Sequence, residues 1–146
     1  MLKFVGGALF ALSFGISAQA AIKEERVTYN DGDTTMKGFV VYDDAVKAKR
    51  PGIVVVHEWW GITKHVHGEA RKFAQQGYTA FIADMYGDAK TADNPKDAGA
   101  LSGGVMKNPQ GMQSRFNAAR DALANAKVDK ESKAEASKFF ASVFKK

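Results

Sequence analysis

His57, Glu58 and Trp59 are the side chains in this 146-residue chain whose types and positions best suit chemistry. They follow directly on residues 53–56, an unbroken run of one isoleucine and three valines that is entered from a Pro-Gly pair. Such a β-branched run predicts a strand buried on both faces of a parallel sheet. Ligands in open α/β sheets bind just beyond the carboxyl ends of these strands. The sequence therefore places a candidate site at this strand end, where a carboxylate alone gives general base catalysis at most.

A strand, a helix and a second strand are predicted to position this cluster. Residues 64–76 have helical periodicity, Gly77 predicts the C-cap, and residues 78–83 form another short apolar strand. The apolar stripe of the helix consists of Val66, Ala70, Phe73 and Ala74. The three elements make a βαβ unit, whose crossover should be right-handed. Residues 84–87 then leave the sheet at the same carboxyl edge as His57.

The chain before this unit predicts an antiparallel hairpin. Residues 25–29 and 36–42 read as strands, and the Asn-Asp-Gly-Asp sequence at residues 30–33 is a strong turn signal. Residues 43–50 are polar and are expected to loop across to the next strand.

The chain after the unit predicts a loop and two helices. Residues 88–110 are rich in Gly, Asp, Asn and Lys, which favours a mobile loop with a short helix inside. Residues 112–127 predict an amphipathic helix, and residues 130–144 predict a last helix. The apolar face of the first of these helices comprises Phe116, Ala119, Leu123 and Ala126.

Composition excludes several classes of function. The formal net charge of +5 at pH 7 is mildly basic, but no run of Lys and Arg interleaves with aromatic residues, so nucleic acid is not an expected partner. The chain has no cysteine, which excludes disulfides, thiolate metal sites and a cysteine nucleophile among these residues.

Residues 1–20 are expected to be a secretory signal peptide rather than part of the fold. A lysine precedes a mostly apolar stretch at residues 5–16, and Ala18-Gln19-Ala20 is an A-x-A cleavage signal. A retained membrane anchor is the weaker interpretation, because a bilayer span needs about 20 continuous apolar residues. The protein is therefore expected to be secreted, most simply to a bacterial periplasm, without stable membrane insertion after cleavage.

Several blocks of sequence, in order, resemble the dienelactone hydrolase family, a branch of the α/β-hydrolase fold. The matching blocks are residues 51–58 with Gly61, residues 77–80 and residues 83–87. The resemblance covers residues 25–129 and implies a truncated three-layer αβα sandwich: a short mixed sheet, built from the hairpin and the parallel βαβ unit, and a C-terminal helix. It divides the chain into a signal peptide (1–20), an N-terminal part of the family domain (21–129) and a helix outside the family pattern (130–146).

The resemblance also implies roles for individual residues. In the family a glutamate at the end of the third strand contacts a resting cysteine nucleophile, and Glu58 occupies that position. The following backbone N–H, here that of Trp59, contributes to the oxyanion hole. Trp60 and Tyr86 are the candidate substrate-binding side chains, and the implied substrate is a small-molecule ester or lactone, with no cofactor. The two tryptophans suit an apolar ligand cleft and a simple cover for the sheet end equally well.

The sequence departs from the family where the nucleophile should appear. No Gly-x-Ser-x-Gly or Gly-x-Cys-x-Gly occurs, and Ser102 lacks the first glycine and follows no strand. The first hypothesis is thus a dienelactone-hydrolase-like enzyme that is catalytically incomplete as given and inactive alone. The alternative is an exported, non-catalytic ligand-binding or interaction module.

Three further interpretations concern metals, the tail and the sheet edge. His57, His65 and His67, with Glu58 as a fourth ligand, suggest a metal site. His65 and His67 are two positions apart and would not share a helix face, so no metal site is assigned. Phe139, Phe140, Val143 and Phe144 form a stripe that suits packing on the core better than a membrane surface. If the family's strand order is truncated after the helix at 112–127, the strand at residues 53–56 has no neighbour on one side. It then becomes an edge strand and a candidate for self-association.

Overall fold

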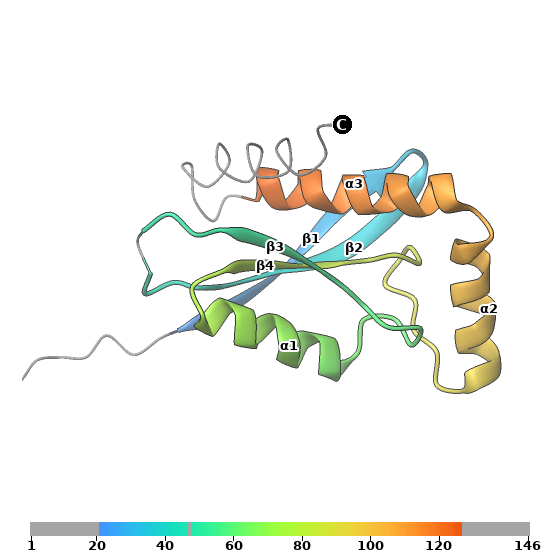
Figure 1. The fold of residues 1–146 in the computed structure, drawn as a ribbon, viewed down its shortest axis with the longest axis horizontal. Helices are drawn as coiled ribbons and strands as arrows, with labels where there is room; N and C mark the ends of the chain where they lie inside the picture. The colour runs from blue at the N-terminus through green and yellow to red at the C-terminus, as the bar shows by residue number, and fades with distance from the viewer. Residues whose placement is uncertain (1–20, 47, 127–146) are drawn as a thin grey trace, which may run out of the picture.

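A mixed four-stranded sheet with helices on both faces forms the body of the protein (Figure 1). The structure is a computed structural model, and it describes residues 21–46 and 48–126. The predicted signal peptide and the predicted helix at residues 130–144 lie outside these residues. The elements are β1 (Ile22–Asp31), β2 (Thr34–Asp43), β3 (Gly52–Val56), α1 (Lys64–Gln75), β4 (Thr79–Ala83), α2 (Pro95–Met106) and α3 (Pro109–Asn125).

The sheet has the order β1-β2-β4-β3 and combines antiparallel and parallel pairs. β1 and β2 pair antiparallel over ten residues each, from Ile22 opposite Asp43 to Asp31 opposite Thr34. The tight connection between them includes Gly32, whose φ of +57° is a conformation that glycine adopts without steric cost. β2 pairs antiparallel with β4, and β4 pairs parallel with β3. The predicted hairpin and βαβ unit are confirmed, although both hairpin strands are longer than predicted.

Two hydrophobic clusters fill the spaces on either side of the sheet. Alternate residues of β2 and β4 point to opposite faces, so neighbours in sequence belong to different clusters. Val40 and Phe81 pack with Ala119 and Leu123 of α3, whereas Val41 and Ile82 pack against α1. Figure 1 shows α3 on one face and α1 on the other. This arrangement confirms the three-layer αβα sandwich.

The end of α1 illustrates how the sequence places β4. Gly77 has a φ of +89° and donates its N–H to the Ala74 carbonyl, while the Tyr78 N–H reaches the Phe73 carbonyl at 3.1 Å. These two bonds form a Schellman motif, and the Phe73 and Tyr78 rings pack with centroids 6.1 Å apart, as that motif favours. The chain therefore reverses sharply and enters β4 at Thr79, as the sequence predicted to within one residue.

β3 is less buried than its sequence predicted. Every residue of β4 is buried, but Ile53, Val54 and Val55 are only partly buried and Val56 is 49% exposed. The expectation of a strand buried on both faces is thus wrong for β3 in this structure, because β3 lies at the edge of the sheet and pairs with β4 alone among the described strands. The edge position itself is the one that the truncated family order predicted.

The region predicted as a loop with a short helix contains the 12-residue helix α2. Its start has a clear signal, because the Asn94 side chain accepts a hydrogen bond from the Asp97 N–H and Pro95 takes the first turn. Three glycines, at positions 99, 103 and 104, weakened the helical signal of its interior. α3 begins in the same way, with Asn108 as N-cap and Pro109 in the first turn. No helix within residues 21–46 and 48–126 is long and apolar enough to cross a membrane.

Candidate functional site

The loops that follow β3 and β4 meet at one edge of the sheet and bring the predicted site residues together. The rings of Trp59 and Trp60 contact each other at a tilt of 59° with centroids 4.9 Å apart, and the Tyr86 hydroxyl donates to the Trp59 carbonyl at 2.9 Å. Glu58 lies beside them in the same loop. The carboxyl ends of adjacent parallel strands share an edge, so residues 28 positions apart in sequence contribute to one surface.

The peptide that joins Glu58 to Trp59 is fixed through its carbonyl. The Glu58 oxygen lies 2.6 Å from Nδ1 of His57 and accepts the Gly61 N–H at 3.1 Å. The peptide is trans, so the Trp59 N–H points away from this anchored oxygen. Within the described residues no acceptor is recorded for that N–H. A fixed, unpaired N–H at a strand end is what one half of an oxyanion hole requires.

His57 connects the two loops. Its Nε2 accepts the backbone N–H of Met85 at 3.1 Å, so Nε2 is unprotonated and Nδ1 carries the hydrogen that Glu58 accepts. The ring is 8% exposed and packs edge-on against Tyr86 with centroids 4.6 Å apart. Burial lowers the pKa of His57, against smaller raising effects of the Glu58 carbonyl and the Asp84 carboxylate. The imidazole is therefore neutral at pH 7.

Asp84 organises the loop after β4. Its fully buried carboxylate accepts four backbone N–H groups at 2.8–3.0 Å. The donors are Lys37 of β2 and three residues of its own loop, Tyr86, Gly87 and Ala89. A buried carboxylate is tolerated when its lone pairs are satisfied in this way. Asp84 thus holds the loop in shape and sets the position of Tyr86.

The two loops contact each other through close backbone approaches. Gly61 has a φ of +86°, and a Cβ at this position would lie 2.4 Å from the Lys90 carbonyl oxygen. The Ala92 N–H also donates to the Trp60 carbonyl at 3.1 Å. Asp88 and Ala89 both have positive φ, at 55° and 52°. Such strained residues persist only where surrounding bonds fix them, as the Asp84 carboxylate does here.

The Glu58 carboxylate is in a different environment. Glu58 is exposed, and no partner for its carboxylate is recorded among the described residues. Trp59 beside it is 43% exposed. An exposed carboxylate, an indole and an N–H without an acceptor among residues 21–46 and 48–126 therefore belong to neighbouring residues at this edge.

Tyr86 faces the interior rather than this open surface. It is 8% exposed, and burial raises the pKa of its hydroxyl, against a smaller lowering by Ser102. It also lines a cavity of about 300 Å³ between α2 and α3, together with Leu101, Val105 and Arg115. The Arg115 guanidinium donates to the Met85 carbonyl at 2.6 Å. Tyr86 therefore supports the Trp59 peptide from behind, and the direct substrate contact predicted for it stays a prediction.

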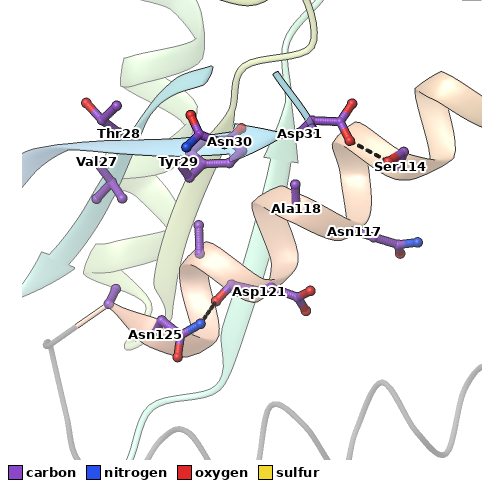
Figure 2. Close-up of a pocket in the computed structure, with 13 residues that line it drawn as sticks. Val27, Thr28, Tyr29, Asn30, Asp31, Ser114, Asn117, Ala118, Asp121 and Asn125 are labelled. Carbon is purple, nitrogen blue, oxygen red and sulfur yellow. Dashed lines mark hydrogen bonds between the residues drawn. The ribbon is translucent and has the colours of Figure 1, made fainter. Parts of the chain in front are cut away.

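A second cavity, of about 530 Å³, lies between β1 and α3 (Figure 2). Its lining is partly polar and partly apolar. Ser114 donates to the Asp31 carboxylate, and the Asn125 amide donates to the Asp121 backbone carbonyl. No imidazole is among its described lining residues, and Ser114 is its one serine. Nothing in this lining resembles a nucleophilic site.

The histidines considered for a metal do not converge. In the described part of the chain, no group of three or more His, Cys, Asp or Glu side chains could hold a metal ion. His57 is committed to the two backbone contacts above, whereas Nδ1 of His67 lies 2.6 Å from Glu24 of β1. Ser102 lies in α2 and donates to the Ala98 carbonyl, which is a helix-internal bond and not a nucleophile elbow.

The fold and the strand-end N–H define an α/β-hydrolase-type architecture, and comparison with known proteins gives the family. The sequence model of the dienelactone hydrolase family matches residues 36–136. The chain belongs to the dienelactone hydrolase family.

Individual relatives agree with this assignment. Protein usf of Aquifex pyrophilus is 33% identical over 87 residues, which are 58% of this chain and 36% of that protein. The crystal structure of a dienelactone hydrolase-like promiscuous phosphotriesterase from metagenomic libraries is 33% identical, with a TM-score of 0.69 over 73% of this chain and 44% of that one. The protein m3DLH is 30% identical, with a TM-score of 0.70 over 76% and 47%. The chain thus spans less than half the length of these relatives.

The residues predicted for the site, Glu58, Trp59, Trp60 and Tyr86, lie together at this edge, and their catalytic and binding roles stay predictions. The structural roles of Asp84 and His57 were not predicted. Asp84 had a signal: a carboxylate directly after an apolar strand and three residues before a glycine suits an acceptor for loop amides. No pattern in the sequence indicated the structural role of His57, because its partner, the Met85 N–H, is 28 residues away.

Proposed function

We propose that this chain supplies the oxyanion side of a site that hydrolyses small-molecule esters or lactones. The observation that carries the proposal is the Trp59 N–H, unpaired among the described residues, on a peptide anchored at its carbonyl by two donors. In acyl transfer such a donor stabilises the negative charge that develops on the carbonyl oxygen. Glu58, at the family's glutamate position, is next to it and is open to a reacting group.

These 146 residues alone are proposed to be inactive, because they contain no nucleophile suited to acyl transfer. The sequence has no cysteine and no Gly-x-Ser-x-Gly elbow. The relatives are about twice as long as the matched region or longer. A complete site would therefore take its nucleophile from residues other than these. The promiscuous phosphotriesterase among the relatives makes phosphotriesters a second ester class to test.

The test is a search for turnover and for a covalent intermediate. The purified protein is incubated with 4-nitrophenyl acetate, and Glu58→Ala serves as the matched variant. We expect equal background rates for both proteins and no acetyl adduct by intact mass. A stoichiometric adduct on one defined side chain would contradict the proposal.

A non-catalytic binding module is the second candidate, and the adjacent rings of Trp59, which is 43% exposed, and of the partly buried Trp60 favour it. An apolar ester could lie on the Trp59 face with its carbonyl oxygen at the Trp59 N–H. Titration with γ-butyrolactone should then quench tryptophan fluorescence in a saturable way, and Trp59→Ala should abolish the saturation. Saturable binding without turnover would favour this candidate.

Self-association through residues 53–56 is proposed as well. β3 is the last strand on its side of the described sheet, and residues 53–56 hold no charge or proline to discourage pairing. Light scattering during size-exclusion chromatography should give a concentration-dependent mass for the wild type and a lower mass for Val56→Lys. A wild-type monomer at every concentration would refute this pairing.

Export is the remaining proposal, and its support is the A-x-A signal at residues 18–20. Expression in a Gram-negative host should yield periplasmic protein whose N-terminal residue is Ala21. Cytoplasmic protein that retains Met1 would exclude it.

A further inference from the structure

His57 contacts the backbone on both sides of the Trp59 N–H. Directly, its Nδ1–H donates to the Glu58 carbonyl, which belongs to the same peptide as that N–H. Indirectly, its ring packs against Tyr86, whose hydroxyl holds the Trp59 carbonyl of the next peptide. Both peptides that flank the Trp59 Cα are thus fixed by one buried imidazole and its aromatic neighbour.

The imidazole is itself fixed from the opposite side. Its Nε2 accepts the Met85 N–H, and the Met85 carbonyl in turn accepts Arg115 of α3. The contacts form a chain from the Met85 amide through the ring to the Glu58 carbonyl. In such chains each bond polarises the next, which increases the donor strength of the terminal N–H.

We propose that His57 is the positioning residue of this site: it orients and polarises the Trp59 N–H through the Glu58 carbonyl. The proposal rests on the proposed oxyanion role of Trp59. It assigns His57 no contact with substrate. It also requires the neutral imidazole, because a ring protonated at Nε2 cannot accept the Met85 N–H.

The charged and titratable groups around the ring are few. Asp84 after β4 attracts the protonated form, Glu58 follows His57 in the chain, and Tyr86 packs against the ring. Arg115 of α3 donates to the neighbouring Met85 carbonyl. Burial has the largest effect and favours the neutral ring, so protonation is expected only in mild acid, below the ordinary histidine pKa of about 6.5.

A three-dimensional HNCO spectrum tests the proposal, because the Trp59 peak reports its own N–H and the Glu58 carbonyl carbon together. We expect the Trp59 and Met85 peaks of the wild type to move between pH 7.5 and 4.5 with one shared midpoint. His57→Gln, whose amide can donate and accept at the same time, should keep the Trp59 peak near its wild-type position and remove the pH transition. His65→Gln, on the exposed start of α1, should leave the transition unchanged.

Two results would overturn the positioning role. One is a wild-type Trp59 peak that stays fixed while Met85 titrates. The other is a Trp59 transition that persists in His57→Gln. A third variant, His57→Phe, removes both hydrogen bonds of the ring. If this variant unfolds, the wild-type titration and His57→Gln still decide the question.

Addition of methylphosphonate, a small oxyanion, separates this proposal from the one on which it rests. If the Trp59 peak titrates with His57 but does not shift at high concentrations of methylphosphonate, the oxyanion role is contradicted and the positioning role is not. A Trp59 N–H that binds the phosphonate with equal affinity in wild type and His57→Phe would contradict positioning alone.

Discussion

Two carboxylates, Glu58 and Asp84, each follow a short apolar strand of the same sheet, yet their environments are opposite. Asp84 is fully buried and accepts four backbone N–H groups. Glu58 is exposed, with no partner recorded for its carboxylate in the described part of the chain. Sequence position alone made the two residues look alike, since both mark the carboxyl edge of the sheet.

The difference lies in which strand each residue follows. β4 is central, so the loop after it is enclosed by β2 and by its own return, and a carboxylate there must be satisfied internally. β3 is at the edge, so the loop after it faces solvent on one side. One carboxylate therefore holds the loops of the candidate site in shape, and the other remains exposed to solvent.

Removal of Asp84 should have the largest effect. Asp84→Ala leaves four backbone donors without their acceptor, and three of them shape a loop that contains two strained residues. We expect the free energy of unfolding to fall by about 3 kcal/mol or more. Urea denaturation followed by circular dichroism measures this loss. Asp93→Ala, at an exposed position of the same region, is the control and should change stability by less than about 0.5 kcal/mol.

The free energy of unfolding should also depend on pH through the buried His57. Because burial lowers the pKa of His57 in the folded protein, the unfolded chain binds the proton more readily below about pH 6.5. The folded state is therefore most stable, as far as His57 is concerned, above pH 6.5. This stability is lost as the pH falls through that value toward the lower pKa of His57 in the folded state. The slope cannot exceed about 1.4 kcal/mol per pH unit for one proton.

Urea midpoints between pH 7.5 and 5 measure this slope. His57→Gln should flatten the curve, whereas His65→Gln should not. An unchanged slope in His57→Gln would assign the titration to another group.

Local sequence patterns were sufficient for most of the sheet and for the crossover helix. The β-branched run at 53–56, the apolar stripe with Gly77 at its end and the Asn-Asp-Gly-Asp turn each specify one element through their own residues. α2 was underestimated because its three glycines oppose a capping signal that Asn94 and Pro95 provide. Capping chemistry was thus a better guide there than composition.

The interior of the site could not be predicted in the same way. The bond from Lys37 to Asp84 spans 47 residues, and that from Met85 to His57 spans 28. A pattern read along the chain does not show which amide a carboxylate or imidazole will meet after the strands pair. The burial of β3 was overestimated for a related reason, since the residue types of a central strand do not reveal whether a neighbour pairs with it.

Relief of strain in the Asp84 loop should have a smaller effect, of the opposite sign. Ala89 has a φ of 52°, which costs an L-residue about 1–2 kcal/mol, whereas glycine adopts it freely. Ala89→Gly also increases the freedom of the unfolded chain, so the expected net gain is about 0.5–1 kcal/mol. Ala100→Gly, within α2, is the matched control and should destabilise by a similar amount. A loss in both variants would mean that the loop can relax around Ala89.

Neutralising Glu58 should have the smallest effect on stability. Glu58→Gln keeps the size of the side chain and removes its charge, and no hydrogen bond to that carboxylate is recorded within the described residues. We expect the urea midpoint to correspond to a change of less than about 0.5 kcal/mol, at every pH from 5 to 8. A loss as large as that of Asp84→Ala would show that Glu58 also has a structural partner, and the two carboxylates would no longer divide into a scaffold and an available group. A stable Glu58→Gln protein would support the proposal that the exposed Glu58 carboxylate serves the candidate site and not the scaffold.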